Sequence, residues 1–130
     1  MRIWLFIGAL NGALAVALGA VGAHALGPAT SDATRAMFET AVRYHLIHSL
    51  ALLAVAAIAP HLLGAGSQRL IQAAGAAFTA GILLFCGGLY ALSGLGMPVG
   101  ARLAPVGGTL LIVGWLMLAA AALMSQTRKS

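Results

Sequence analysis

The stretch from Glu39 to His48 holds most of the side chains that could do chemistry in this chain. Glu39 and Arg43 are four residues apart with the acid on the N-terminal side, the favourable order for an ion pair within one helix. Tyr44 and His48 have the same spacing and share a helix face, which His45 flanks. Histidine can act near neutral pH as a ligand, an acid or a base, so this stretch is the first candidate site.

His24 is the candidate that the first apolar stretch could add. It lies just before the turn that leads into the second helix, so we expect it at a similar depth to the start of that helix and near Tyr44 or His48. A structural interpretation stays open beside the functional one. Glu39 and Arg43 would then stabilise a helix start at headgroup depth, and the histidines would tie two helices together by hydrogen bonds.

The residue types argue against a metal centre and against an enzyme. Two histidines, even if His24 and His48 converged, fall short of a structural zinc set, and Cys86 is the only cysteine. A noncovalent b-type haem between the same two histidines stays open as an alternative. The chain has no nucleophile motif and no phosphate-binding glycine loop, and Asp32 and Glu39 are its only acids. We therefore predict no catalytic residue, no metal and no cofactor.

The composition places these side chains in lipid. Hydrophobic residues make up 62% of the 130 residues and charged residues 7%, against about 25% charged in an average soluble domain. The net charge of +5 could suggest nucleic acid, but the basic residues stand singly between apolar runs. We therefore predict an all-α integral membrane protein that does not bind nucleic acid.

Four apolar stretches account for nearly the whole chain and predict a bundle of four transmembrane helices. Each can cross a hydrocarbon core of about 30 Å at about 1.5 Å per residue. The expected helices cover about residues 3–26, 36–59, 70–95 and 103–124, within one domain of residues 1–130. A cleaved signal peptide is the alternative for the first stretch, because Arg2 precedes an apolar run that ends in Ala23-His24-Ala25. That run is longer than the hydrophobic region of a typical signal peptide, so we expect it to stay.

Basic residues near the helix ends predict the orientation in the membrane. Four spans put both termini and the middle loop on one side. That side carries Arg2, Arg69, Arg128 and Lys129. The opposite side carries Arg35 and Arg102, while Arg43 lies within a helix. The positive-inside rule therefore predicts that both termini are cytoplasmic.

Small residues recur in register and predict close helix packing. The first helix carries a stripe of them, and two later helices repeat glycine every seven residues. The residues are Gly8, Gly12, Ala15, Gly19 and Gly22, then Gly81 with Gly88, and Gly107 with Gly114. Helices in lipid associate through such small residues, so we expect tight pairs with a left-handed sense and infer no ligand from the stripes.

Four ordered motifs in the chain are similar to those of a known family. They are ALGAVGAHAL at residues 17–26, Thr40-Ala41 followed by Tyr44 and His48, LFCGGLY at residues 84–90, and PVGG with GW at residues 105–115. On these the chain resembles the YgdD-like and YwdK-like small membrane proteins (domain of unknown function 423, transmembrane protein 256-like). The resemblance covers almost the whole chain and implies four spans with cytoplasmic ends in bacteria. It brings no molecular function.

The resemblance also implies a shared polar centre of His24, Tyr44, His48 and Tyr90. Two positions depart from the family pattern: His45 stands where glutamine is common, and Cys86 where serine is common. The candidate ligand-binding residues are therefore His24, Glu39, Arg43, Tyr44, His48 and Tyr90.

Two roles stay open for a protein of the bacterial inner membrane. The first is a binding or accessory module for a lipid, a quinone or a membrane partner, with self-association through the small residues. The second is a minimal proton-linked transporter or channel that uses His24 and His48. The polar residues crowd one half of the chain's second span while Leu50–Ile58 is uniformly apolar, which favours binding.

Overall fold

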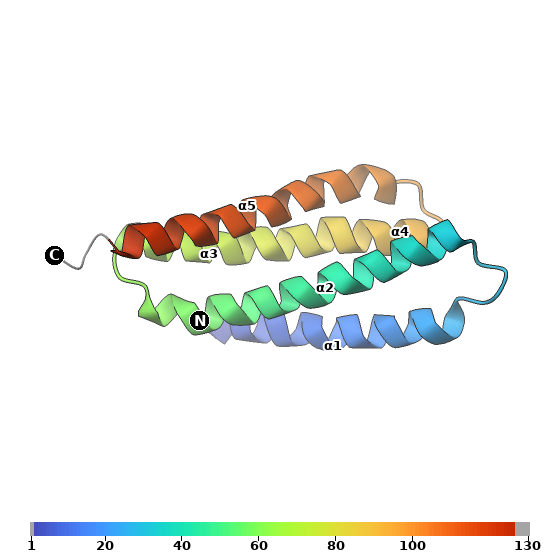
Figure 1. Cartoon of the computed structure of the whole chain (residues 1–130), viewed down its shortest axis with the longest axis horizontal. Helices are drawn as coiled ribbons and strands as arrows, with labels where there is room; N and C mark the ends of the chain where they lie inside the picture. The colour runs from blue at the N-terminus through green and yellow to red at the C-terminus, as the bar shows by residue number, and fades with distance from the viewer. Residues whose placement is uncertain (1, 127–130) are drawn as a thin grey trace.

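A computed structural model of the chain describes residues 2–126, and these form four long helical segments without a strand (Figure 1). Each segment is long and apolar enough to cross a membrane, which confirms the predicted all-α bundle of four spans. Arg128 and Lys129, which enter the charge count above, lie outside the described residues. The elements are α1 (Arg2–Ala25), α2 (Asp32–Ile58) with a 3-10 turn (Ala59–His61), a third segment made of α3 (Ala65–Gly81), a π-helical turn (Ile82–Cys86) and α4 (Gly87–Leu95), and α5 (Gly100–Gln126).

The second, third and fourth spans begin earlier than the apolar pattern predicts, because local signals start them in polar sequence. Helix α2 starts at Asp32, where the Ser31 hydroxyl caps the helix by accepting a hydrogen bond from the backbone N–H of Thr34 at 3.1 Å. Gly64 adopts φ 98°, a conformation that suits glycine, and lets the chain turn directly into α3. Helix α5 already starts at Gly100, ahead of the predicted residue 103.

The four segments run alongside one another in an antiparallel bundle (Figure 1). Helix α1 packs mainly on α2, and α5 packs mainly on the third segment, while α2 and the third segment pack against each other. The turn between α2 and α3 lies at the end where α1 begins and α5 ends, and the loops after α1 and α4 lie at the opposite end. We call the latter the loop end. Helix α2 is therefore an inner helix with α1 on one side.

Glycines let the helices approach closely, as their spacing predicts. A Cβ atom on Gly22 of α1 would meet the ring of Phe38 on α2. On the other side of the bundle, a Cβ atom on Gly107 of α5 would meet the backbone nitrogen of Phe85. The core lies between α2, the third segment and α5, and its fully buried side chains include Leu52, Val55, Ile71, Phe78 and Cys86.

Candidate functional site

His48 is buried, and both nitrogens of its ring are hydrogen-bonded inside the protein. Nδ1 lies 2.7 Å from the carbonyl oxygen of Tyr44. A carbonyl oxygen can only accept, so Nδ1 carries the proton and donates it. Trp115 Nε1 donates to Nε2 of His48 at 3.0 Å. The neutral ring therefore has every polar atom paired, and the second bond ties α2 to α5.

His45 is the centre of a second hydrogen-bonded chain, although it was not among the predicted candidates. Its Nε2 lies 2.9 Å from Oδ1 of Asn11, and its Nδ1 lies 3.0 Å from the hydroxyl of Tyr90. Asn11 donates from Nδ2 to the carbonyl of Ile7 at 2.8 Å, which turns Oδ1 towards the imidazole. A neutral His45 then donates to Asn11 and accepts from Tyr90. This chain joins α1, α2 and α4.

Both histidines of the middle of α2 thus act as ties between helices. The predicted cluster of Tyr44, His48 and Tyr90 is divided, because His48 faces α5 whereas His45 and Tyr90 meet on the side of α1 and α4. The sequence held one signal for the missed partner: the first span contains a single amide, Asn11, and an amide in lipid needs a hydrogen-bonding partner.

His24 joins neither group, so the expectation that it lies near Tyr44 or His48 is wrong. Gly22 faces Phe38 and Gly12 faces Ser49, which makes His24 level with about residue 36. His48 then lies roughly 18 Å deeper along the bundle. His24 is also exposed, because it stands about 200° around α1 from the buried Gly22. The haem alternative between His24 and His48 fails for the same reason.

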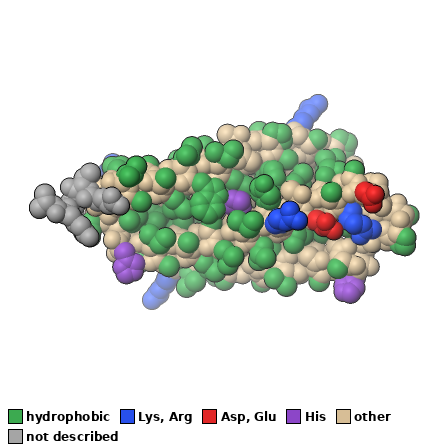
Figure 2. Space-filling model, in the orientation of Figure 1, with side chains coloured by type: hydrophobic (Ala, Val, Ile, Leu, Met, Phe, Trp, Pro, Cys, Tyr) green, Lys and Arg blue, Asp and Glu red, His purple; other side chains and the backbone are tan. Residues whose placement is uncertain are grey.

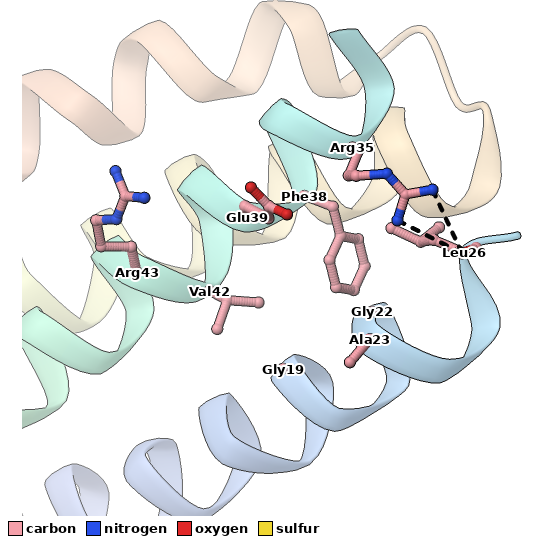
Figure 3. A pocket seen from close by; sticks show the side chains of 9 residues that line it. All are labelled: Gly19, Gly22, Ala23, Leu26, Arg35, Phe38, Glu39, Val42 and Arg43. Carbon is pink, nitrogen blue, oxygen red and sulfur yellow. Dashed lines mark hydrogen bonds between the residues drawn. The ribbon is translucent and has the colours of Figure 1, made fainter. Parts of the chain in front are cut away.

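A pocket of about 260 Å³ lies between α1 and α2 towards the loop end (Figure 3). Helix α1 lines it with small residues. Helix α2 lines it with two apolar side chains and three charged ones. The lining residues are Gly19, Gly22 and Ala23 of α1, Leu26 just after it, and Arg35, Phe38, Glu39, Val42 and Arg43 of α2. Two of the predicted candidates, Glu39 and Arg43, therefore border this pocket.

The charged residues of the pocket form a row along α2. Arg35, Glu39 and Arg43 follow at intervals of four residues, and Figure 2 shows basic and acidic side chains alternating along one face of the bundle. The Arg35 guanidinium donates to the carbonyls of Leu26 and Gly27, with distances of 2.9 Å to 3.5 Å, and so caps the end of α1. Arg35 is a functional candidate that the spacing from Glu39 could have revealed.

Glu39 and Arg43 do not form the ion pair that their spacing favours. No salt bridge is present among residues 2–126, and neither side chain has a hydrogen-bond partner in that part of the chain. Both side chains are exposed. In Figure 3 the Arg43 guanidinium points away from the Glu39 carboxylate. The rim of the pocket therefore carries a carboxylate and a guanidinium that have no partner among residues 2–126.

Comparisons with known proteins place the chain among membrane proteins without an assigned activity. The family model described as "Protein of unknown function (DUF423)" matches residues 18–108. The UPF0382 membrane protein YwdK of Bacillus subtilis is 40% identical over 122 residues, which is 94% of this chain and 97% of YwdK. A UPF0382 membrane protein of Haemophilus influenzae is 35% identical over 116 residues, covering 89% of this chain and 90% of that protein.

A relative from Staphylococcus epidermidis, also a UPF0382 membrane protein, is 35% identical over 123 residues, 95% of this chain and 97% of its own length. No solved structure matches the chain. The family match extends over most of the chain and agrees with the resemblance stated from the four motifs. The chain belongs to the DUF423 family of membrane proteins of unknown function.

Proposed function

We propose that the protein binds a phospholipid headgroup in the pocket between α1 and α2. The observation that carries this proposal is that Glu39 and Arg43, beside a pocket of about 260 Å³, have no partner among the described residues 2–126. An ionisable side chain within a membrane span is a functional candidate by default, and its partner has to be identified. The lipid itself is the partner that the bundle meets at this position.

The depth of Arg43 supports a lipid phosphate as its partner. Helix α2 has 27 residues, which corresponds to about 40 Å. A hydrocarbon core of about 30 Å centred on this helix begins about 5 Å from its first residue. Arg43 then lies roughly 11 Å below that boundary. A charge at this depth is costly unless it is paired, and a phosphate drawn into the pocket would pair it.

The order of the charges favours a headgroup with both a phosphate and an ammonium group. Glu39 lies nearer the loop end than Arg43 by one turn of α2, about 6 Å. Phosphatidylethanolamine carries its ammonium outside its phosphate, so the ammonium would meet Glu39 and the phosphate would meet Arg43. The headgroup of phosphatidylglycerol has no ammonium group and would leave the Glu39 carboxylate without a cation.

We infer that the protein lies in the bacterial inner membrane with cytoplasmic termini. Helical spans and the bacterial sources of its relatives support that membrane, and the basic residues at the ends of the spans support that orientation. The loop end then faces the non-cytoplasmic side. The pocket would accordingly take its lipid from the non-cytoplasmic leaflet.

Native mass spectrometry with added lipid tests the proposal. Unaltered protein and the Arg43→Gln and Arg102→Gln variants would each receive dioleoylphosphatidylethanolamine or dioleoylphosphatidylglycerol. Arg102 is the matched control, because it is an exposed arginine at the same end that does not line the pocket. We expect the control to retain phosphatidylethanolamine like the unaltered protein and Arg43→Gln to lose it.

The Glu39→Gln variant tests the lipid class within the same spectra. Removing the carboxylate should abolish the preference for phosphatidylethanolamine over phosphatidylglycerol. Equal retention of both lipids by all variants would refute the proposal. The subunit number in the same spectra reports whether the protein also associates with itself or retains another membrane protein.

The proton-linked transporter gains no support from this geometry. Both ring nitrogens of His48 are paired within the protein, and His24 lies about 18 Å away along the bundle axis. His24 and His48 therefore do not form a continuous path for protons through the bundle. Lipid binding, which uses Glu39 and Arg43, is the role that the charges support.

A further inference from the structure

A second hollow lies on the side of α2 that faces α5, away from the α1–α2 pocket. Its volume is about 460 Å³, and we call it the aromatic groove because rings form much of its wall. The ring centroids of Tyr44 and Phe85 are 5.0 Å apart. The ring of His48 lies close to both Tyr44 and Trp115, with centroid distances of 6.0 Å and 5.8 Å. The groove therefore offers aromatic faces from α2, α5 and the π-helical turn.

One polar group of the aromatic groove has no partner in the described part of the chain. The Trp115 N–H and both ring nitrogens of His48 are hydrogen-bonded, and the Thr109 hydroxyl donates to the carbonyl of Pro105 at 2.9 Å. The Tyr44 hydroxyl makes no hydrogen bond to any residue from 2 to 126. Its side chain is 41% exposed and lines the groove. A ligand in the groove would meet this hydroxyl as a free donor.

The depth of the aromatic groove limits what can reach it. Tyr44 lies about 18 Å and His48 about 24 Å from the first residue of α2, so the groove is near the middle of the bilayer. No Lys, Arg, Asp or Glu lines the groove, so no charged side chain would draw a phospholipid headgroup into it as Arg43 would at the α1–α2 pocket. An occupant must therefore be soluble in hydrocarbon. An unpaired hydroxyl is costly in such surroundings, so a hydrogen-bond acceptor on the occupant would stabilise the complex.

We propose that the aromatic groove binds the head ring of an isoprenoid quinone. Such a molecule joins a flat ring with carbonyl acceptors to a long apolar tail. Its ring would lie against the faces of Tyr44 and Trp115, and one carbonyl would accept the Tyr44 hydroxyl hydrogen. A lipid acyl chain could fill the same volume but would leave that hydroxyl unpaired. The proposal concerns binding alone, and it is independent of the headgroup pocket because it uses other residues on another side of α2.

Tryptophan fluorescence tests this proposal, because the chain has two tryptophans and Trp115 lines the groove. The Trp4→Phe protein leaves Trp115 as the only indole. It would be titrated in detergent micelles with decylubiquinone, a short-tailed quinone that quenches indole fluorescence on contact. We expect quenching that saturates. The Trp115→Phe protein, which reports from Trp4, should show only a linear decline from collisions.

The Tyr44→Phe substitution on the Trp4→Phe background isolates the hydroxyl. It keeps the ring and removes one exposed donor, so its unfolding temperature should match that of the parent. Loss of one neutral hydrogen bond should raise the dissociation constant of decylubiquinone about five-fold. Linear quenching of Trp115, or the same dissociation constant with and without the hydroxyl, would overturn the proposal. Equal displacement of decylubiquinone by octadecane in both proteins would identify an acyl-chain groove and overturn it as well.

Discussion

Trp115 on α5 donates a hydrogen bond from Nε1 to Nε2 of His48 on α2 across 3.0 Å. The two rings also pack against Phe78 of α3, with centroid distances of 5.7 Å for His48 and 5.1 Å for Trp115. One polar bond and two ring contacts thus join three helices at one level of the bundle. Since helices in lipid gain little from mutual hydrophobicity, such a polar tie has a specific part in holding them together.

The first prediction concerns this tie between α2 and α5. Trp115→Phe keeps most of the ring but removes the donor, so it should lower the free energy of unfolding by about 0.5 to 2 kcal/mol. Unfolding followed by circular dichroism in detergent micelles would measure the loss. The His48→Leu variant and the double variant complete a double-mutant cycle. Additive losses would contradict a direct interaction between the two side chains.

The second prediction separates hydrogen bonding at His45 from its packing. His45→Leu should lower the free energy of unfolding by about 1 to 3 kcal/mol, because Asn11 and Tyr90 each lose their partner on α2. Glutamine keeps a donor and an acceptor, so His45→Gln should lower the free energy of unfolding by less than half of that amount. The same circular dichroism assay compares the two variants. Equal losses would mean that the hydrogen-bonded chain adds nothing measurable.

The sequence predicted the four spans because their apolar length leaves little alternative in lipid. It placed three helix starts too late, because Ser31 and Asp32 read as loop residues although they cap and begin α2. Gly64 likewise looks like part of a longer turn, whereas α3 begins directly after it at Ala65. Caps consist of polar residues, so an apolar pattern alone finds the membrane-crossing part of a helix better than its ends.

The site was harder to predict, because it depends on which helix faces pack against one another in the bundle. The stripe of Gly8, Ala15 and Gly22 marks the face of α1 that meets α2, and His24 lies on the opposite face. The position of His24 opposite this stripe could have been predicted from the sequence. The partnership of His48 with Trp115 could not, since no residue pattern states that α5 rather than α1 lies beside that face of α2.

The third prediction tests the orientation of the protein in the membrane, which decides the leaflet that the lipid pocket faces. Cys86 is the only cysteine and is buried, so a Cys86→Ala chain provides a background for single introduced cysteines. Thr30→Cys in the loop after α1 should react with a membrane-impermeant maleimide in intact cells. His61→Cys at the other end should react only after the membrane is opened. The reverse pattern would place the termini outside and the pocket in the cytoplasmic leaflet.

The last prediction uses two glycines as a matched pair. A Cβ atom on Gly107 of α5 would meet the backbone of Leu84 and Phe85, which cannot move aside as a flexible side chain could. Gly107→Ala should therefore lower the free energy of unfolding by about 1 to 3 kcal/mol. Gly87 has no atom within 4 Å of such a Cβ atom. Gly87→Ala should instead raise it by up to about 1 kcal/mol, since alanine favours a helix.

Circular dichroism in the same micelles would measure both variants, and the sign of the difference between them is the informative result. A loss at Gly107 with a gain at Gly87 shows that the glycines are needed where α5 and the third segment touch, and only there. Equal losses would show that glycine is needed for the flexibility of the helices themselves. The close approach of α5 would then have to depend on other contacts, of which the hydrogen bond from Trp115 to His48 is the first to examine.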